Sequence, residues 1–172
     1  MAIKFEDFSI KVKDAIDDAA IAFLYEAAGE MEAQTKRNVP NHGRWFTEQK
    51  NAWTYKVDEG EKVATIGNPL ERAIWTEYGT GEYADGGKGR QGYWVYVKDS
   101  DSGTDDSGGY TYKGGKSYTL EEAKRIVAMM RADRKDAYYT KGQIAHRPFK
   151  KAYTKLKPRL IKLAEERFKE LK

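Results

Sequence analysis

Two long amphipathic patterns, one near each end of the chain, most limit the folds open to this sequence. Between residues 8 and 36 apolar residues recur at three- and four-residue steps, the period of one helix face; they are Ile16, Ala19, Ala20, Phe23, Ala27 and Met31. The same steps return between 148 and 171, with Phe149, Ala152, Tyr153, Leu156, Leu160, Leu163 and Leu171. Each helix must cover its apolar face, so we expect both to pack on one face of a sheet.

The middle of the chain supplies the strands of that sheet. Residues 51–57 alternate between two faces, and 62–67 follow after a turn at 58–61, so a hairpin is predicted. Residues 92–99 form another strand pattern, and 136–143 are read as a strand and turn. We therefore predict an α+β fold, a small mainly antiparallel sheet packed against long N- and C-terminal helices, within a single domain over 1–172.

Two shorter segments have helix signals of their own. Thr119 and Glu122 have the spacing of a capping box for a helix over 119–134, inside a loop-helix insertion at about 98–138 whose loop is expected to be flexible. A second helix is predicted over 69–78. Its signals are Asn68 as N-cap, Pro69 at the first position, Glu71 closing a box, Gly79 as C-cap, and a single apolar face of Leu70, Ala73, Ile74 and Tyr78.

Composition excludes several classes of protein. The absence of cysteine removes disulfides, thiolate catalysis and cysteine-based zinc sites. The longest apolar runs are only a few residues long, so no membrane span is expected. The net charge of +4 is too small to argue for nucleic acid by itself, but it is unevenly distributed. Residues 144–172 carry ten basic and three acidic residues, a net of +7, whereas residues 1–37 carry five and eight, a net of −3.

Several short motifs resemble cofactor or metal sites, but the residues around them do not fit such sites. The string G-T-G-E-Y-A at 79–84 follows a predicted helix, whereas a dinucleotide fingerprint follows a strand and opens a helix. The G-G-K-S string at 114–117 lacks the first glycine of a phosphate-binding loop, and 99–110 lacks the last glutamate of a calcium loop. The two histidines, His42 and His146, are far apart, and neither lies in an H-x-x-H or H-E-x-x-H pattern that would bind a metal. We predict no catalytic, cofactor or metal site, and hence no enzyme.

The order of features resembles a known family. The matching residues are N-V-P-N-H-G-R at 38–44, T-I-G-N at 65–68, R-A-I-W-T-E-Y-G-T-G at 72–81, G-Y-W-V-Y-V at 92–97 and Y-T-K-G-Q-I-A-H-R-P-F-K-K-A-Y at 139–153. The sequence is similar to the head–tail joining family of long-tailed bacteriophages, the neck or tail-completion proteins also labelled minor tail components. Asn41 and His42 depart from the family's usual Asp-Thr before Gly43, so that turn is expected to differ.

The resemblance implies a structural role in the virion, at the neck or upper tail, for a protein made in the cytoplasm of the bacterial host. It implies a homo-oligomeric ring around the DNA channel, with six copies favoured and twelve as the alternative. The implied partners are a head-closure or adaptor protein, the tail tube protein, and double-stranded DNA passing without sequence specificity; no cofactor or membrane is implied. A tail terminator and a nucleic-acid-binding module using the basic C-terminal helix stay open as alternative functions, and an enzyme as a disfavoured third.

Aromatic and arginine side chains anchor protein interfaces, and the chain contains twelve tyrosines and four tryptophans. A ring contact joins one patch of a subunit to a different patch of the next subunit. The oppositely charged ends of this chain could supply two such complementary patches. We therefore expect the interface residues to lie mainly in the 75–80 segment and its surroundings; the candidates are Trp75, Glu77, Tyr78, Thr80, Trp94, Arg147 and Phe149. Candidate contacts to channel DNA or to an acidic partner are Lys150, Lys151, Lys155, Lys157 and Arg159.

Overall fold

The computed structural model describes residues 9–98, 110–112 and 116–169, and the chain divides into two compact units. Unit 1 consists of Met1–Pro69 and Pro148–Lys172, and unit 2 of Leu70–Arg147. Among the described residues, each unit has its own hydrophobic core. That both units act as one head–tail joining domain stays a prediction.

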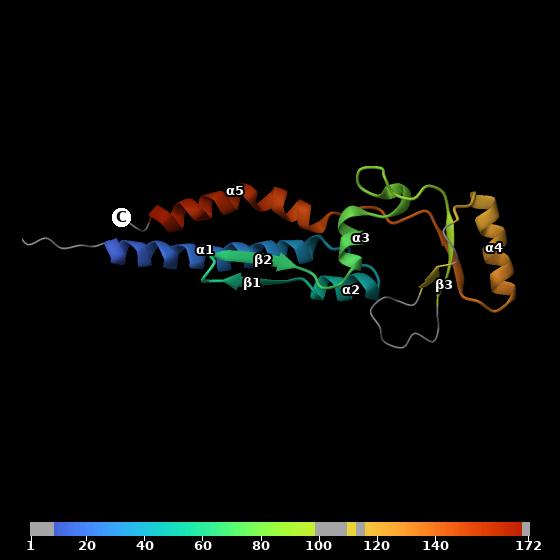
Figure 1. Ribbon diagram of the computed structural model, residues 1–172, viewed down its shortest axis with the longest axis horizontal. Coiled ribbons are helices and arrows are strands. Elements are labelled where there is room, and N and C mark those ends of the chain that lie inside the picture. The colour runs from blue at the N-terminus through green and yellow to red at the C-terminus, as the bar shows by residue number, and fades with distance from the viewer. Residues whose placement is uncertain (1–8, 99–109, 113–115, 170–172) are drawn as a thin grey trace, which may run out of the picture. The chain divides into compact units, whose positions relative to one another are not determined.

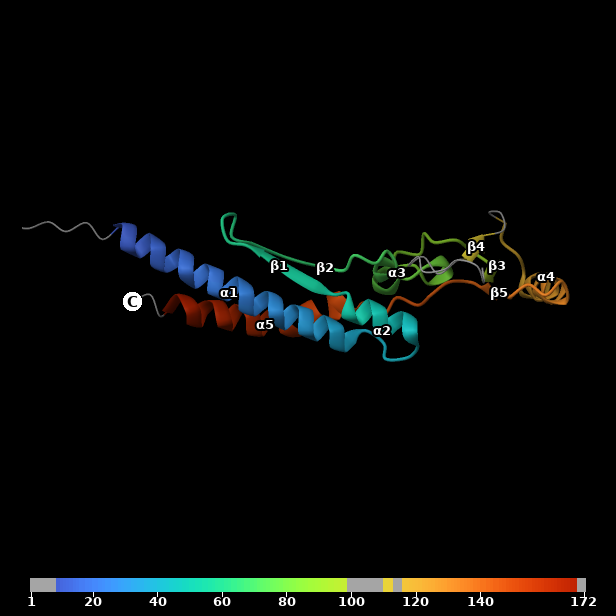
Figure 2. The same cartoon turned by 90° about the horizontal axis from the view of Figure 1, so that it is seen from below.

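Unit 1 is built on the two long helices that the sequence predicted. Helix α1 (Ser9–Asn38) and helix α5 (Pro148–Lys169) run antiparallel and side by side (Figures 1 and 2). Met31 of α1 packs with Ala152 and Leu156 of α5, so the two predicted apolar faces meet there. Ile16 and Tyr153, which were predicted on these faces, are exposed. The packing of α1 on α5 brings the acidic N-terminal and basic C-terminal segments together within one chain.

The predicted hairpin lies against α1 in the same unit. Strand β1 (Thr54–Asp58) pairs antiparallel with strand β2 (Val63–Gly67), with Tyr55 opposite Ile66. Exposed and half-buried residues alternate along β1 as the sequence indicated. The Asp58 carboxylate accepts a hydrogen bond from the Glu61 N–H at 2.9 Å, which closes the turn.

A short helix that the sequence analysis missed precedes the hairpin. Helix α2 (Arg44–Asn51) begins after Gly43, whose φ of 83° ends the preceding turn, and it has no side-chain N-cap. Its Phe46 is buried with Val39 and Trp53 in the second core cluster of unit 1. Eight residues without a capping side chain leave little local signal for a helix.

Unit 2 contains a three-stranded antiparallel sheet covered by one helix. Strand β3 (Trp94–Lys98) lies between β4 (Tyr110–Tyr112) and β5 (Ala137–Thr140). Helix α4 (Leu120–Ala132) packs on β3 and β5, and the core consists of Val95, Ala123, Val127 and Ala137. The predicted capping box is present, since Thr119 Oγ1 accepts from the Glu122 N–H and Glu122 accepts from the Thr119 N–H at 2.8 Å.

The α+β class and the long terminal helices are confirmed. The strands of the described residues form two separate antiparallel sheets, one in each unit, whereas a single sheet was predicted. The helix predicted in the 98–138 insertion is α4, but the glycine- and aspartate-rich loop at 99–109 lies outside the described residues.

Candidate functional site

The 76–82 segment, which carries the E-Y-G-T-G string, lies against residues 141–147 in unit 2. Thr80 N–H donates to the Gln143 carbonyl at 2.9 Å, and Glu82 N–H donates to the Lys141 carbonyl at 3.0 Å. The Thr76 carbonyl accepts from the N–H groups of His146 and Arg147, at 2.8 and 3.3 Å. We call this contact between 76–82 and 141–147 the glycine crossing. It joins two of the segments on which the family resemblance rests.

Glycine is required where the two backbones approach most closely. Gly81 has φ 59°, and a Cβ there would overlap the Lys141 carbonyl oxygen and the Trp94 ring. Gly142 has φ 132°, and a Cβ there would overlap the Thr80 carbonyl. Gly81 and Gly142 therefore allow the two backbones to pack closely.

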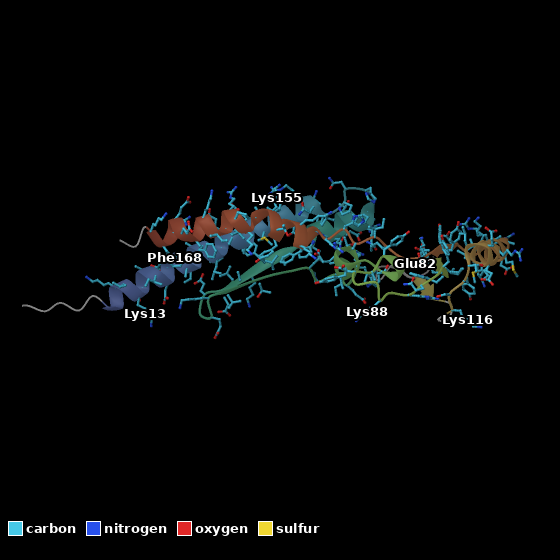
Figure 3. The ribbon with its side chains drawn as sticks, turned by 90° about the horizontal axis from the view of Figure 1, so that it is seen from above. Lys13, Glu82, Lys88, Lys116, Lys155 and Phe168 are labelled. Carbon is cyan, nitrogen blue, oxygen red and sulfur yellow. The ribbon has the colours of Figure 1, made fainter. Side chains whose placement is uncertain are left out.

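Side chains reinforce the glycine crossing. The Thr80 hydroxyl accepts from the Gln143 N–H at 2.9 Å, and the Gln143 side-chain amide donates to the Thr76 hydroxyl at 3.2 Å. Glu82 (Figure 3) pairs with Lys141 at 3.1 Å and accepts from the Gly92 N–H at 3.1 Å. The Lys141 ammonium also lies 5.2 Å from the centre of the Tyr83 ring. Lys141 and Gln143 were not among the predicted site residues.

The Glu82 carboxylate gives the glycine crossing a pH dependence. Its hydrogen bonds from Lys141 and from the Gly92 N–H lower the pKa of Glu82 below its ordinary value. A carboxylate with a lowered folded-state pKa stabilises the fold above the unfolded-state pKa, and this stabilisation is lost as the pH falls through the folded-state pKa.

We expect Glu82→Gln to lower the thermal unfolding midpoint at about pH 7, and the deficit to shrink as the pH falls below about 4. Thermal unfolding followed by circular dichroism at both pH values measures this. The control is Glu121→Gln, which removes an exposed pair with Lys124 and should change little. An unchanged deficit in acid would contradict the assignment.

Helix α3 (Arg72–Tyr78) presents its large apolar residues to solvent. Ile74, Trp75 and Tyr78 are 59%, 41% and 58% exposed, whereas Arg72, Ala73 and Thr76 are buried. Of the single apolar face predicted from Leu70, Ala73, Ile74 and Tyr78, only Ala73 is buried. The helix is held through the Thr76 carbonyl, which accepts hydrogen bonds from the N–H groups of His146 and Arg147. Its large apolar residues therefore remain exposed and available to a partner.

The start of α3 also differs from the prediction. The helix begins at Arg72 and has no side-chain cap, so Pro69 is not its first residue. The Asn68 amide instead donates to the Gln49 carbonyl at 2.7 Å, within unit 1. The end is as predicted, since Gly79 is the C-cap with φ 72° and its N–H donates to the Trp75 carbonyl at 2.8 Å. A helix thus precedes the G-T-G-E-Y-A string. A dinucleotide fingerprint would instead follow a strand and open a helix.

The other interface candidates take varied places. Glu77, Thr80 and Trp94 are half-buried, and Arg90 lies 5.0 Å over the Trp94 ring. Arg147 pairs with Asp85 at 2.7 Å. Phe149 lies in unit 1, where its ring stacks on Trp53 at 5.8 Å in the core. The structure therefore gives Phe149 a packing role in its own unit.

Several basic residues of α5 are paired with α1. Arg159 bonds Glu30 at 2.5 Å, Arg167 bonds Glu26 at 2.8 Å, and the Lys155 ammonium (Figure 3) donates to Gln34 at 3.3 Å. Part of the opposite charge of the chain ends is therefore matched inside unit 1. Lys150, Lys151 and Lys157 are exposed on the same helix. The availability of α5 to a polyanion is smaller than its sequence charge indicates.

Two other kinds of site are absent from the described part of the chain. No helix there is long and apolar enough to cross a membrane. No group of three or more histidine, aspartate or glutamate residues there could hold a metal ion. The G-G-K-S string and the acidic 99–110 string fall largely outside the described residues.

Comparison with known proteins bears on the segment that contains α1, the hairpin and α3. Residues 4–79 match the HK97-gp10-like family, described as "Bacteriophage HK97-gp10, putative tail-component". The match supports a phage head–tail joining or tail protein family. The matched segment ends at Gly79, so it includes α3 and its exposed aromatic residues. No curated protein and no solved structure matched the chain.

Proposed function

We propose that the chain is a structural subunit of the phage neck, which joins the portal end of the capsid to the tail as a ring around the DNA channel. The family match to a phage tail component supports a place in the virion. The observation that carries the proposal further is the exposed α3 surface, formed by Ile74, Trp75 and Tyr78, within the matched segment. Aromatic residues on a rigid support are typical anchors of protein interfaces.

The glycine crossing supplies the rigid support. It connects the end of α3 to residues 141–147 through hydrogen bonds between the backbones of the two segments. An interface residue held this way loses little conformational freedom on binding, which favours assembly. The α3 surface would contact a neighbouring subunit, the head-closure or adaptor protein, or the tail tube protein, and six copies would match the tail.

The double variant Trp75→Ala/Tyr78→Ala should assemble poorly while each chain stays folded, because both side chains are exposed. Truncating an interface anchor typically costs about 2 kcal/mol or more of binding. Native mass spectrometry and negative-stain imaging, with the protein alone and with tail tubes of the same phage, measure assembly.

Met129→Ala provides the matched control, because Met129 is exposed on α4 outside the α3 surface. The control should assemble like the unchanged chain, and circular dichroism should be the same for all three proteins. Intact rings formed by the double variant would refute the role of the α3 surface. An unchanged chain that joins neither portal nor tail tube would count against the neck function itself.

A further inference from the structure

Helix α5 carries a second, mainly apolar stripe beside the face that packs on α1. The stripe consists of Tyr153, Lys157, Ile161, Ala164 and Phe168, at intervals of four, four, three and four residues, which keeps them on one side of a helix. Tyr153, Ile161 and Phe168 are 50%, 51% and 43% exposed. Phe168 lies near the C-terminal end of the helix (Figure 3). We call these five residues the α5 stripe.

A shallow groove runs along the border between this stripe and α1. Its lining consists of Phe23 from α1 together with Tyr153, Lys157, Leu160, Ile161 and Ala164 from α5. All but Lys157 are apolar or aromatic. Two antiparallel helices with such a groove form half of a four-helix arrangement, and a further helix pair would bury the stripe.

The spacing of the stripe is nearly symmetric about Ile161. Lys157 lies four residues before Ile161 and Glu165 four residues after it, while Tyr153 and Phe168 lie eight before and seven after. If two copies of α5 align antiparallel at Ile161, Lys157 of each is opposite Glu165 of the other. Tyr153 of each then meets Phe168 of the other. This alignment pairs opposite charges and pairs aromatic residues between the two copies.

The charges that this pairing uses have no ion-pair partner in the part of the chain that the structure describes. Lys157 and Glu165 form no ion pair within the described residues. The arginines that do pair with α1, Arg159 and Arg167, lie at helical positions outside the stripe. The ion pairs within unit 1 therefore leave Lys157 and Glu165 available for a partner.

We propose that the free protein forms a twofold dimer through the α5 stripe, with the two α5 helices antiparallel about Ile161. Because a twofold contact uses the same patch on both subunits, it closes on itself and does not build a ring. The dimer is thus a form of the protein before assembly, separate from contacts made by the α3 surface. It does not depend on the proposed neck function.

Sedimentation equilibrium of the full chain at several concentrations tests the dimer. The unchanged chain should be dimeric, and Ile161→Glu should be monomeric because it places two carboxylates against each other on the axis. Met129→Glu is the matched control on α4, and it should stay dimeric. Circular dichroism checks that each variant is folded, which is expected because Ile161 is exposed.

A charge exchange tests the register. Lys157→Glu and Glu165→Lys should each weaken the dimer more than about tenfold through like-charge contacts, and the double variant Lys157→Glu/Glu165→Lys should restore it. A monomeric unchanged chain would overturn the proposal, as would a dimer that Ile161→Glu leaves intact. Failure of the charge exchange to restore the dimer would overturn the antiparallel register. None of these outcomes bears on ring formation with tail tubes.

Discussion

Gly81→Ala is expected to destabilise unit 2 by roughly 2–5 kcal/mol, from left-handed backbone strain and from overpacking. Gly81 has φ 59°, and the added methyl group would overlap the Lys141 carbonyl and the Trp94 ring. The carbonyl belongs to the backbone, so no side-chain rotation can relieve the overlap. The Glu82-to-Lys141 hydrogen bond should break as the two segments separate. Denaturant unfolding and hydrogen exchange at the amides of 80–82 measure the two effects.

Gly86→Ala separates strain from overlap. Gly86 also has a left-handed φ, 81°, but a Cβ there would have no heavy atom within 4 Å. It should therefore show only the backbone cost of about 1–2 kcal/mol, without loss of exchange protection at the glycine crossing. Equal losses in the two variants would mean that close packing at Gly81 contributes nothing.

The long helices were predictable because their signals are local and repeated. The three- and four-residue spacing from Ile16 to Met31 continues over several turns, and α1 extends over Ser9–Asn38. The capping box of α4 is equally local, since Thr119 and Glu122 satisfy each other's backbone N–H groups. In both cases the residues that decide the structure lie within a few positions of one another.

Local signals failed where a distant partner took over the side chain. Asn68 has the chemistry of an N-cap, but its amide bonds the Gln49 carbonyl, so α3 begins without it. Ile74 and Tyr78 have the spacing of one apolar face, but both are exposed. Helix α3 is held instead by the hydrogen bonds that the Thr76 carbonyl accepts from residues 146 and 147. Helix α2 gave almost no signal because it is short and lacks a capping side chain.

The candidate site could be predicted only in part. The sequence indicated that the glycines after Tyr78 end a helix, which the C-cap at Gly79 confirms. It could not indicate that Thr80 pairs with Gln143, because backbone hydrogen bonds between segments about 60 residues apart leave no periodic pattern. The assignment of interface and DNA contacts to individual residues stays a prediction.

Trp53→Ala should destabilise unit 1 by about 3–5 kcal/mol, because it empties a large volume in a core where neighbouring side chains can only partly close the gap. Trp53 is buried with Val39 and Phe46, and its ring stacks on Phe149 with an angle of 9° between the planes. The loss should loosen the start of α5 as well as the hairpin, since Phe149 comes from that helix. Denaturant unfolding followed by far-ultraviolet circular dichroism measures it.

Two further variants separate packing from other effects. Trp53→Phe should cost less than Trp53→Ala, because it keeps a ring against Phe149 and the buried Trp53 Nε1 has no hydrogen-bond partner among the described residues to lose. Trp75→Ala removes an exposed tryptophan and should change stability by no more than about 0.5 kcal/mol. If Trp53→Ala and Trp75→Ala were equally stable, the core assignment of Phe149 would be wrong, and its earlier place among the interface candidates would regain support.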